Sequence, residues 1–328
     1  MMSKEIQIGI VSVDNDLHAI AIQNLFEKRY HLKCHIFKID CISGTSSFNW
    51  SNVDELEYQS LLSNSTGDVV NIRELCVIWW RRFSRHQKVS SHVVDERHID
   101  LINNDCEASL LGLLLNTFSG TWISDPTATR LADNKLIQLK AAQIAGFRVP
   151  KTLVSQNPQV IREFCRSLSN KVVVKPVRGT SKVPLFTQML TEEHLASEES
   201  LHLCPAMYQE YIPGHRHIRA HCFGDNIYSV LIEAEDLDWR QNLDIPFKPF
   251  ELNAKSKQCL LQVLRVLNLK MGVFDLKLDF DGNLIWLEVN PQGQFLFSEG
   301  LSGLDLTSAF INFIYQEAQQ SYHQGCLV

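Results

Sequence analysis

The sequence predicts an α/β protein, because strand and helix patterns alternate from its start and a long hairpin pattern lies near its end. Residues 5–13 (EIQIGIVSV) have the pattern of a buried strand, 17–29 that of a helix, and 32–40 that of a second strand. This β-α-β order is typical of a parallel α/β lobe. Residues 272–295 carry two alternating runs around Asp281-Gly282, a strong signal for a hairpin. The 328 residues are enough for two or three lobes with cores of their own.

Composition is that of an ordinary globular protein, with 45% hydrophobic and 21% charged residues. A net charge of −6 and a pI near 6.1 disfavour broad electrostatic binding to nucleic acid or to an anionic membrane. The nine cysteines are scattered, odd in number and free of any CxxC, which is typical of reduced thiols in a cytosolic protein. No run approaches the roughly 18 apolar residues of a membrane helix. We therefore expect a cytoplasmic protein that binds neither nucleic acid nor membrane.

The N-terminal region lacks the usual nucleotide-binding motifs. No GxGxxG follows the first strand and no GxxxxGK[ST] occurs, so a Rossmann site and a P-loop are both disfavoured. Residues 43–72 are polar and suggest surface turns with an edge hairpin. Residues 76–82 (CVIWWRR) predict a strand that brings Arg81 and Arg82 to the carboxyl end of the sheet, where either could face a carboxylate or phosphate. In the plainer interpretation Trp79 packs in the core and the arginines form ordinary ion pairs.

The middle and end of the chain alternate predicted helices with short strands. Helices are expected over 97–118, 127–145, 157–168, 252–268 and 304–318. The helix over 127–145 carries Lys135 and Lys140, and either lysine alone is most simply solvated. Strands are expected at 151–154 and 171–175, and residues 235–250 have the composition of a loop-like insertion.

The acidic residues of the hairpin define a register. If residues 281–282 form the loop, Phe280 faces Asn283, and Asp275 falls directly opposite Glu288. Opposite residues have Cβ atoms roughly 4.5–5.5 Å apart, so the two carboxylates converge. A slip of one residue would separate them.

Asn290 lies one same-face step beyond Glu288, which adds a carboxamide to the two carboxylates. Close carboxylates repel, so Asp275 and Glu288 suggest a divalent cation or a shared proton. Oxygen ligands of this kind suit Mg²⁺. Asp279 lies about 13 Å along the strand from Asp275, at ~3.3 Å per residue, too far to share one ion. The alternative is a hairpin whose polar residues simply face water.

Two further stretches could contact a nucleotide. The strand at 171–175 ends in Lys175, and a turn with Gly179, Thr180 and Ser181 follows. A strand lysine beside such a turn can hold phosphates through its ammonium and the backbone N–H groups, although turns of this composition are common. The strand at 208–212 (YQEYI) could offer its backbone and Glu210 to an adenine edge.

A second hairpin pattern surrounds Gly224-Asp225. Its alternation places His217, Arg219 and His221 on one face. Such a face could bind an anion or a substrate carboxylate. The histidines lack the partner set of a metal site, which disfavours zinc.

Taken in this order, these stretches resemble the ATP-grasp superfamily of carboxylate–amine ligases over about residues 125–300. The resemblance implies ATP and Mg²⁺ as cofactors and three sets of site residues. The nucleotide set is Lys135, Lys175, Gly179, Thr180, Ser181, Glu210, Tyr211, Ile212 and Leu287, with 178–182 as a lid loop and 210–212 as the hinge that reads adenine. The Mg²⁺ ligands are Asp275, Glu288 and Asn290. Catalysis is assigned to Arg219, which steadies the transferred phosphate, and to Lys175.

Within this superfamily, three short motifs are most similar to the microviridin-type peptide maturases: VIWWRR, the DWR of 238–240 and NPQGQF at the metal site. Those enzymes join side-chain carboxylates of a precursor peptide to hydroxyls or lysine amines. The resemblance thus implies a precursor peptide or another carboxylate as substrate, and it allows a homodimer. Two departures concern the site: His217 stands where many related ligases, including the RimK type, carry Asp, and the lid has one glycine.

The implied fold is an ATP-grasp fold with a parallel α/β lobe (1–124), a central and lid subdomain (125–208) and a larger mixed-sheet lobe that carries the metal hairpin (209–328). Two other functions stay open. One is a RimK-like ligase that adds amino acids to a small molecule or protein terminus. The other is a nucleotide-binding regulatory protein without turnover. An α/β protein with no nucleotide site is disfavoured, because it leaves the ordered motifs unexplained.

Overall fold

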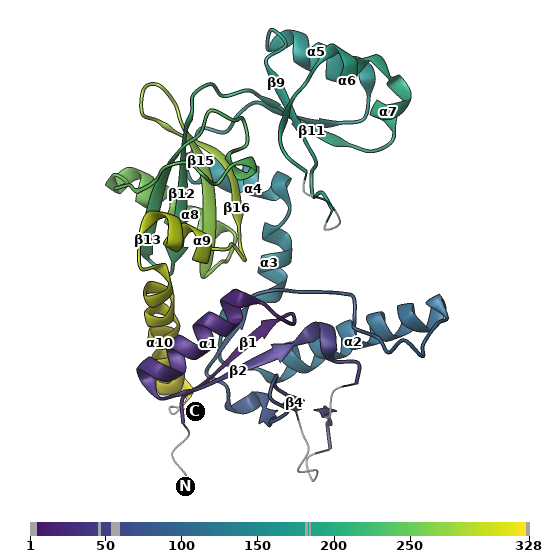
Figure 1. Ribbon diagram of the computed structural model, residues 1–328, viewed down its shortest axis with the longest axis vertical. Coiled ribbons are helices and arrows are strands. Elements are labelled where there is room, and N and C mark those ends of the chain that lie inside the picture. The colour runs from purple at the N-terminus through teal and green to yellow at the C-terminus, as the bar shows by residue number, and fades with distance from the viewer. Residues whose placement is uncertain (1–4, 45–46, 54–59, 181–182, 184, 326–328) are drawn as a thin grey trace. The chain divides into compact units, whose positions relative to one another are not determined.

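The computed structural model describes residues 5–44, 47–53, 60–180, 183 and 185–325. Contacts divide the chain into two units, one of residues 1–126 with 305–328 and the other of residues 127–304 (Figure 1). The three-part boundaries expected from the sequence remain a prediction. Among the described residues, no helix is both long enough and apolar enough to cross a membrane.

The first unit contains a parallel four-stranded sheet in the order β2-β1-β6-β7. Its strands are β1 (Gln7–Ser12), β2 (Lys33–Lys38), β6 (Val77–Trp80) and β7 (Thr121–Ile123). Helix α1 (Leu17–Tyr30) connects β1 to β2, which confirms the predicted β-α-β start. Asp16 caps α1 by accepting a hydrogen bond from the backbone N–H of His18.

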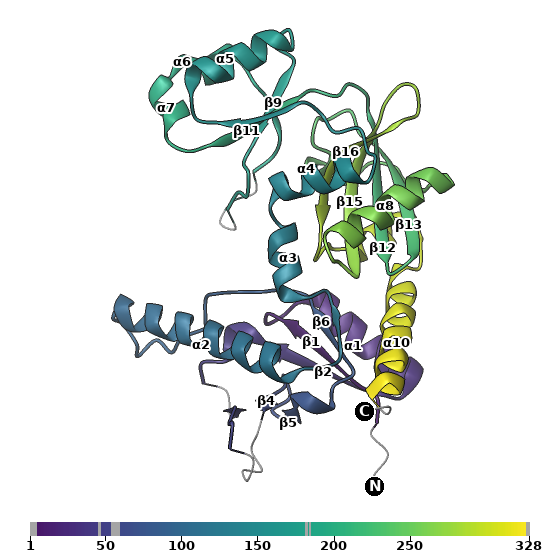
Figure 2. The ribbon, with the colours of Figure 1, turned by 180° about the vertical axis from the view of Figure 1, so that it is seen from behind.

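Two further helices cover opposite faces of this sheet. Ile78 and Trp80 pack with the leucines of α2 (Glu96–Thr117). Trp79 points to the other face, where its ring packs edge-to-face against Phe310 of α10 (Leu306–Gly325). The two ring centroids are 4.7 Å apart. The last helix of the chain therefore completes the first unit, as both ribbon views show (Figures 1 and 2).

A small antiparallel sheet lies beside this lobe, formed by β3 (Phe48–Asn49), β4 (Leu61–Ser63) and β5 (Val69–Asn71). It accounts for the edge hairpin predicted in 43–72, of which residues 45–46 and 54–59 are outside the described residues.

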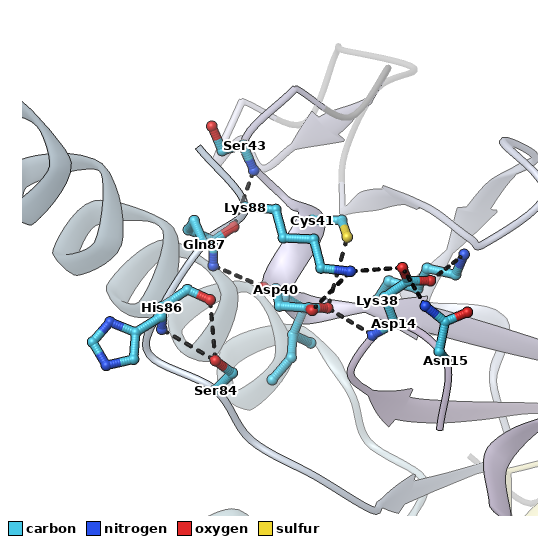
Figure 3. A network of polar contacts seen from close by, with 11 residues as sticks. Asp14, Asn15, Lys38, Asp40, Cys41, Ser43, Ser84, His86, Gln87 and Lys88 are labelled. Atoms are coloured by element: carbon cyan, nitrogen blue, oxygen red, sulfur yellow. Dashed lines mark hydrogen bonds and ion pairs between the residues drawn. The ribbon is translucent and has the colours of Figure 1, made fainter. Parts of the chain in front are cut away.

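Charged side chains form ion pairs at the carboxyl ends of β1 and β2 (Figure 3). Lys88 Nζ lies 2.6 Å from Asp14 Oδ2 and 3.6 Å from Asp40 Oδ2, and Lys38 Nζ lies 2.9 Å from Asp14 Oδ1. The hydrogen bonds from Lys88 and Lys38 lower the pKa of Asp14 to about 2. Nearby, the buried Arg81 pairs with Asp16 at 3.2 Å. These contacts tie the segment after β6 to the strand ends, in line with the plainer interpretation of the arginines.

The second unit contains two sheets. The smaller, antiparallel one has the order β10-β9-β11-β8, from β8 (Thr152–Ser155), β9 (Val172–Lys175), β10 (Gln188–Met189) and β11 (Ala206–Glu210). Helices α5 (Pro158–Ser167), α6 (Glu192–Ala196) and α7 (Glu198–His202) accompany it. Ile161 of α5 packs against Val172 and Tyr208 in a core of their own.

The larger sheet has the antiparallel order β14-β13-β12-β15-β16. Its strands are β12 (Arg216–Phe223), β13 (Asn226–Glu233), β14 (Phe247–Pro249), β15 (Met271–Leu278) and β16 (Leu284–Asn290). One isolated parallel bridge joins Arg148 to Ile285. Helices α4 (Lys135–Ile144) and α8 (Ala254–Val266) pack on the face that carries Ile218 and Ala220 (Figure 2). Helix α9 (Leu296–Ser302) follows β16.

Two local predictions in this unit are wrong. The single helix expected over 127–145 is two, α3 (Pro126–Ala132) and α4, because the Asn134 side chain accepts hydrogen bonds from the N–H groups of Leu136 and Ile137 and starts a new helix. The insertion at 235–250 is not all loop, since β14 adds an edge strand to β13.

The turn of the organising hairpin also differs from the prediction. Asp279 N–H donates to Asn283 O at 3.0 Å, so the loop has three residues, Phe280 to Gly282, and Phe280 does not face Asn283. Gly282 takes a φ of +82°, a left-handed conformation that suits the last position of a three-residue hairpin loop.

A bulge at Leu287 then restores the predicted register. Strand pairing runs one residue out of the predicted register as far as Leu276, which faces Trp286. Beyond Leu287, Asp275 faces Glu288. The extra residue of a β-bulge absorbs the shift, so the alignment of the two carboxylates is confirmed although the turn was wrong.

Candidate active site

A cavity of about 420 Å³ in the second unit is lined by residues from both of its sheets. Eleven of the thirteen site residues expected from the sequence line it: Lys135, Lys175, Gly179, Thr180, Glu210, Tyr211, Ile212, Asp275, Leu287, Glu288 and Asn290. Arg219 is buried next to Asp275, and Ser181 lies outside the described residues. Residues separated by more than 150 positions thus converge on one site.

Asp275 is held by Arg219 from the neighbouring strand. The Arg219 Nη1 donates to both carboxylate oxygens of Asp275 at 2.8 Å, and its Nη2 donates to Gln294 O at 3.1 Å. The guanidinium also lies 5.5 Å from the Trp239 ring and 5.2 Å from the Phe297 ring. Burial raises the pKa of Asp275, and the Arg219 charge opposes that rise.

Glu288 has a cation partner of its own. Lys135 Nζ, at the start of α4, lies 3.2 Å from Glu288 Oε2. Removal from water would raise the pKa of Glu288, but Lys135, Lys175 and Arg240 together hold it below its ordinary value. The two carboxylates therefore lie side by side, each with a cation partner of its own.

Gln138 fixes the backbone beside Glu288. Its side-chain amide donates to Val289 O at 2.8 Å and to Ala132 O at 2.7 Å, and its carbonyl accepts from Val289 N–H at 3.0 Å. This buried amide joins α4 to β16 and holds Lys135 and Glu288 at a fixed spacing. Nothing in the local sequence distinguishes Gln138 from a solvated helix residue.

Lys175 and the turn after it form another wall of the cavity. Burial lowers the pKa of Lys175 to about 8, while Glu288 opposes that shift. Gly179 takes a φ of +83°, which a residue with a side chain rarely adopts, and it lines the cavity with Thr180. An ammonium beside a turn of this kind has the chemistry to bind phosphate oxygens.

The segment expected to read adenine lies at the end of β11. Glu210 Oε1 lies 3.2 Å from Arg148 Nη2, and its Oε2 accepts from Lys151 N–H at 3.1 Å. Tyr211 N–H donates to Lys171 O at 3.0 Å, and Ile212 is buried. These contacts anchor the segment while its residues line the cavity.

The Asp238-Trp239-Arg240 triplet also reaches this cavity, although the sequence singled it out only as a likeness to peptide maturases. Asp238 Oδ2 accepts from Arg240 Nη2 at 2.6 Å and from Thr187 N–H at 3.1 Å. The carboxylate thus links the insertion to the segment after the lid turn. Arg240 adds a further positive charge to the cavity wall.

His217 and Lys277 form a buried pair in the same wall; the sequence placed His217 on a face that could bind an anion, but it did not single out Lys277. Lys277 Nζ lies 3.5 Å from His217 Nε2. Burial lowers the pKa of His217 to about 3 and that of Lys277 to about 8. At neutral pH the imidazole is therefore uncharged, and it can accept a hydrogen bond from a mostly protonated lysine.

The oxygen ligands and the surrounding cations suit a magnesium nucleotide. Asp275, Glu288 and Asn290 offer two carboxylates and a carboxamide, the hard donors that Mg²⁺ takes. Within the described ranges, no group of three or more His, Cys, Asp or Glu side chains could hold a metal ion. A site here would therefore depend on the Asn290 oxygen and on ligands from outside the protein.

Comparison with solved structures defines the fold as that of the ATP-grasp ligases. The macrocyclase MdnC of Microcystis aeruginosa, bound with precursor peptide MdnA, superposes with a TM-score of 0.85 at 22% identity, over 95% of this chain and 100% of that one. A RiPP-associated ATP-grasp ligase of Chryseobacterium gregarium, in complex with ADP and a leader and core peptide, superposes with a TM-score of 0.82 at 20% identity, over 95% of this chain and 97% of that one. The ATP-grasp ligase PsnB, complexed with a phosphomimetic variant of a minimal precursor, Mg and ADP, superposes with a TM-score of 0.73 at 19% identity, over 95% of this chain and 99% of that one.

No protein-family model and no curated protein sequence matches this chain. The similarity therefore lies in the three-dimensional structure, and at these identities it establishes the fold, including the expected ATP-grasp architecture.

Proposed function

We propose that this protein is an ATP-dependent ligase that activates a carboxylate as an acyl phosphate and joins it to an amine or hydroxyl. The observation that carries the proposal is the convergence of Asp275, Glu288 and Asn290 with Lys135 and Lys175 in one cavity of about 420 Å³. That combination matches the charge pattern of a magnesium nucleotide, and the fold is that of ligases solved with ADP.

Bound ATP would supply the phosphoryl group, and Mg²⁺ held by the two carboxylates and the carboxamide would neutralise its oxygens. The protein's own part is positioning and charge. Lys135 and Lys175 bind phosphate oxygens, and Arg219 offsets charge that develops on the transferred group. Residues 210–212 hold the base.

The reaction balances in two steps. The substrate carboxylate attacks the γ-phosphorus, the bond to the β–γ bridging oxygen breaks, and ADP leaves with that electron pair. An amine or hydroxyl then attacks the acyl carbon and loses a proton, and inorganic phosphate departs with the bonding pair, leaving an amide or ester. The turn that carries Gly179 and Thr180 excludes water from the acyl phosphate.

We infer that the carboxylate belongs to a peptide side chain, so that the product is a crosslinked or otherwise modified peptide. MdnC was solved with a precursor peptide and the Chryseobacterium ligase with a leader and core peptide, and both match this chain along nearly its whole length. The Asp238-Trp239-Arg240 triplet supports the same assignment, because it places a guanidinium in the cavity wall where a carboxylate could dock.

Calorimetric titration with a non-hydrolysable ATP analogue and Mg²⁺ tests the nucleotide site. Wild type should bind saturably and Lys175→Ala should lose that binding, because a phosphate contact is removed. Lys140→Ala, which changes an exposed lysine outside this cavity, is the control and should bind like wild type. No binding by folded wild type would refute the site.

Turnover is tested with Glu288→Gln, which keeps the shape of the side chain and removes its charge. ADP release with a peptide library rich in Asp, Glu, Ser, Thr and Lys should fall by on the order of 100-fold while the fold persists. Full activity in that variant would contradict the metal assignment. ADP release only with free amino acids would instead favour a ligase of small molecules, and binding without any ADP release would favour a regulatory protein.

A further inference from the structure

Lys277 is a buried lysine in the cavity wall to which neither the sequence nor the proposed reaction assigns a role. It lies on β15, and its exposed fraction is 4%. Its side chain lines the cavity, and its ammonium contacts His217 Nε2 at 3.5 Å. The imidazole is a neutral partner and leaves the lysine's charge uncompensated.

Three other cations near Lys277 each have a carboxylate partner. Lys135 pairs with Glu288, Arg219 with Asp275 and Arg240 with Asp238. Among the described residues, no carboxylate forms an ion pair with Lys277. A buried ammonium without a counter-charge is costly, so its presence in a cavity wall points to an anionic ligand group.

Strand register places Lys277 relative to the rest of the site. On β12 and β15, His217 faces Lys277 and Arg219 faces Asp275. Residues two apart on a strand are roughly 7 Å apart, so Lys277 lies one step from the metal ligands. That step leads toward Arg216, the first residue of β12, which follows the 210–212 segment in the chain.

Lys277 therefore lies between the end of the site that holds the base and the end that holds the metal. In a nucleotide, the ribose and the α-phosphate come between the base and the metal-bound β- and γ-phosphates. Of these two groups, the α-phosphate carries the charge that a buried ammonium lacks.

We propose that Lys277 binds the α-phosphate of the nucleotide and that His217 is a positioning residue, which orients the ammonium by accepting its hydrogen bond. This inference rests on the proposed nucleotide site and adds a specific contact to it. It also gives a reason for a neutral residue at position 217: a carboxylate there would pair with Lys277 and compete with the phosphate.

The test compares four ligands that differ in their phosphates. Calorimetry with ATP, ADP, AMP and adenosine, each with Mg²⁺, is carried out on wild type and Lys277→Met, which keeps the length of the side chain. We expect affinities for ATP, ADP and AMP to fall by roughly tenfold, the value of one charge-assisted hydrogen bond, and the affinity for adenosine to stay unchanged. Lys140→Met, at an exposed lysine on α4, is the matched control and should change none of them.

Stability supplies an independent readout. Without nucleotide, Lys277→Met should unfold at the wild-type temperature or above it, because an uncompensated buried charge has been replaced by an apolar chain of similar volume. The rise in melting temperature on adding saturating ADP should be smaller than in wild type. His217→Asp should also leave the unfolding temperature unchanged or higher and reduce the rise on adding ADP, because the new carboxylate would form an ion pair with Lys277.

Several results would overturn the inference. One is an unchanged affinity of folded Lys277→Met, or of folded His217→Asp, for AMP and ADP. A loss that extends to adenosine would place the contact on the ribose or base, and a loss confined to ATP would place it on the γ-phosphate. Failure of wild type to bind any of the four ligands would refute the nucleotide site itself, which distinguishes the two proposals.

Discussion

The ion pair between Arg219 and Asp275 allows a quantitative test of how the site is held together before any ligand binds. Both side chains are largely buried, with exposed fractions of 7% and 14%. Asp275→Asn keeps the size of the side chain and removes its charge. The variant therefore leaves a buried guanidinium that cannot lose its proton.

The size of the loss follows from what remains around Arg219. Breaking one side of a buried pair costs about 3–5 kcal/mol. After the substitution, Gln294 O still accepts from Nη2 at 3.1 Å, and two aromatic rings remain within 5.5 Å of the guanidinium. These contacts keep part of the stabilisation, so we expect the lower end of the range, a loss of about 3 kcal/mol in the free energy of unfolding.

Urea unfolding followed by tryptophan fluorescence measures this loss, since Trp239 and Trp286 lie in the same unit as the pair. The denaturant slope should stay constant while the midpoint falls. Glu233→Gln is the matched control. It breaks the Lys248–Glu233 pair, which has the same 2.8 Å separation but lies at the surface, and it should change stability little.

Equal effects of the two substitutions would refute the reasoning, because burial is what separates them. A loss below about 1 kcal/mol for Asp275→Asn would likewise show that the guanidinium is not dependent on this carboxylate.

Two further predictions concern other parts of the chain. Burial lowers the pKa of His18 to about 4 in the folded protein. The unfolded chain therefore binds this proton more tightly than the folded one. The stability present above pH 6.5 is lost as the pH falls toward 4. The free energy of unfolding should fall by about 2 kcal/mol between pH 7 and pH 5. His18→Gln should flatten this pH dependence, as measured by urea unfolding. Parallel pH profiles of the variant and the wild type would contradict the argument. Gly293→Ala should destabilise the protein by about 2 kcal/mol, because a Cβ at position 293 would lie 2.3 Å from the Val273 Cβ. Gly300→Ala, where a Cβ meets nothing within 4 Å, is its control, and a similar melting temperature for both variants would refute the steric argument.

Local pattern in the sequence was sufficient for much of the fold. Period-two alternation and turn residues located the strands of both hairpins, and the β-α-β start predicted the parallel sheet. The predicted alignment of Asp275 with Glu288 also holds, but only because a bulge at Leu287 offsets the longer turn. The strand and turn patterns depend on neighbours within a few residues, which the sequence displays directly.

Other features depend on contacts between distant residues. The pairing of Lys277 with His217 and the bonds from Gln138 to β16 join positions 60 and 151 residues apart in the chain. A buried polar side chain and a solvated one look alike in a sequence. The sequence therefore did not show that Gln138 and Lys277 are buried at the site.

The sequence by itself identified candidate residues for a magnesium nucleotide site, because carboxylate, carboxamide and ammonium groups have that chemistry wherever they lie. Tertiary structure alone decided which charges are compensated: Glu288 by Lys135, Asp275 by Arg219, and Lys277 by no described carboxylate. It also decided that residues 305–328 belong with the first 126. The physical reason is that charge compensation and burial depend on distances across the fold, which side-chain identity does not specify.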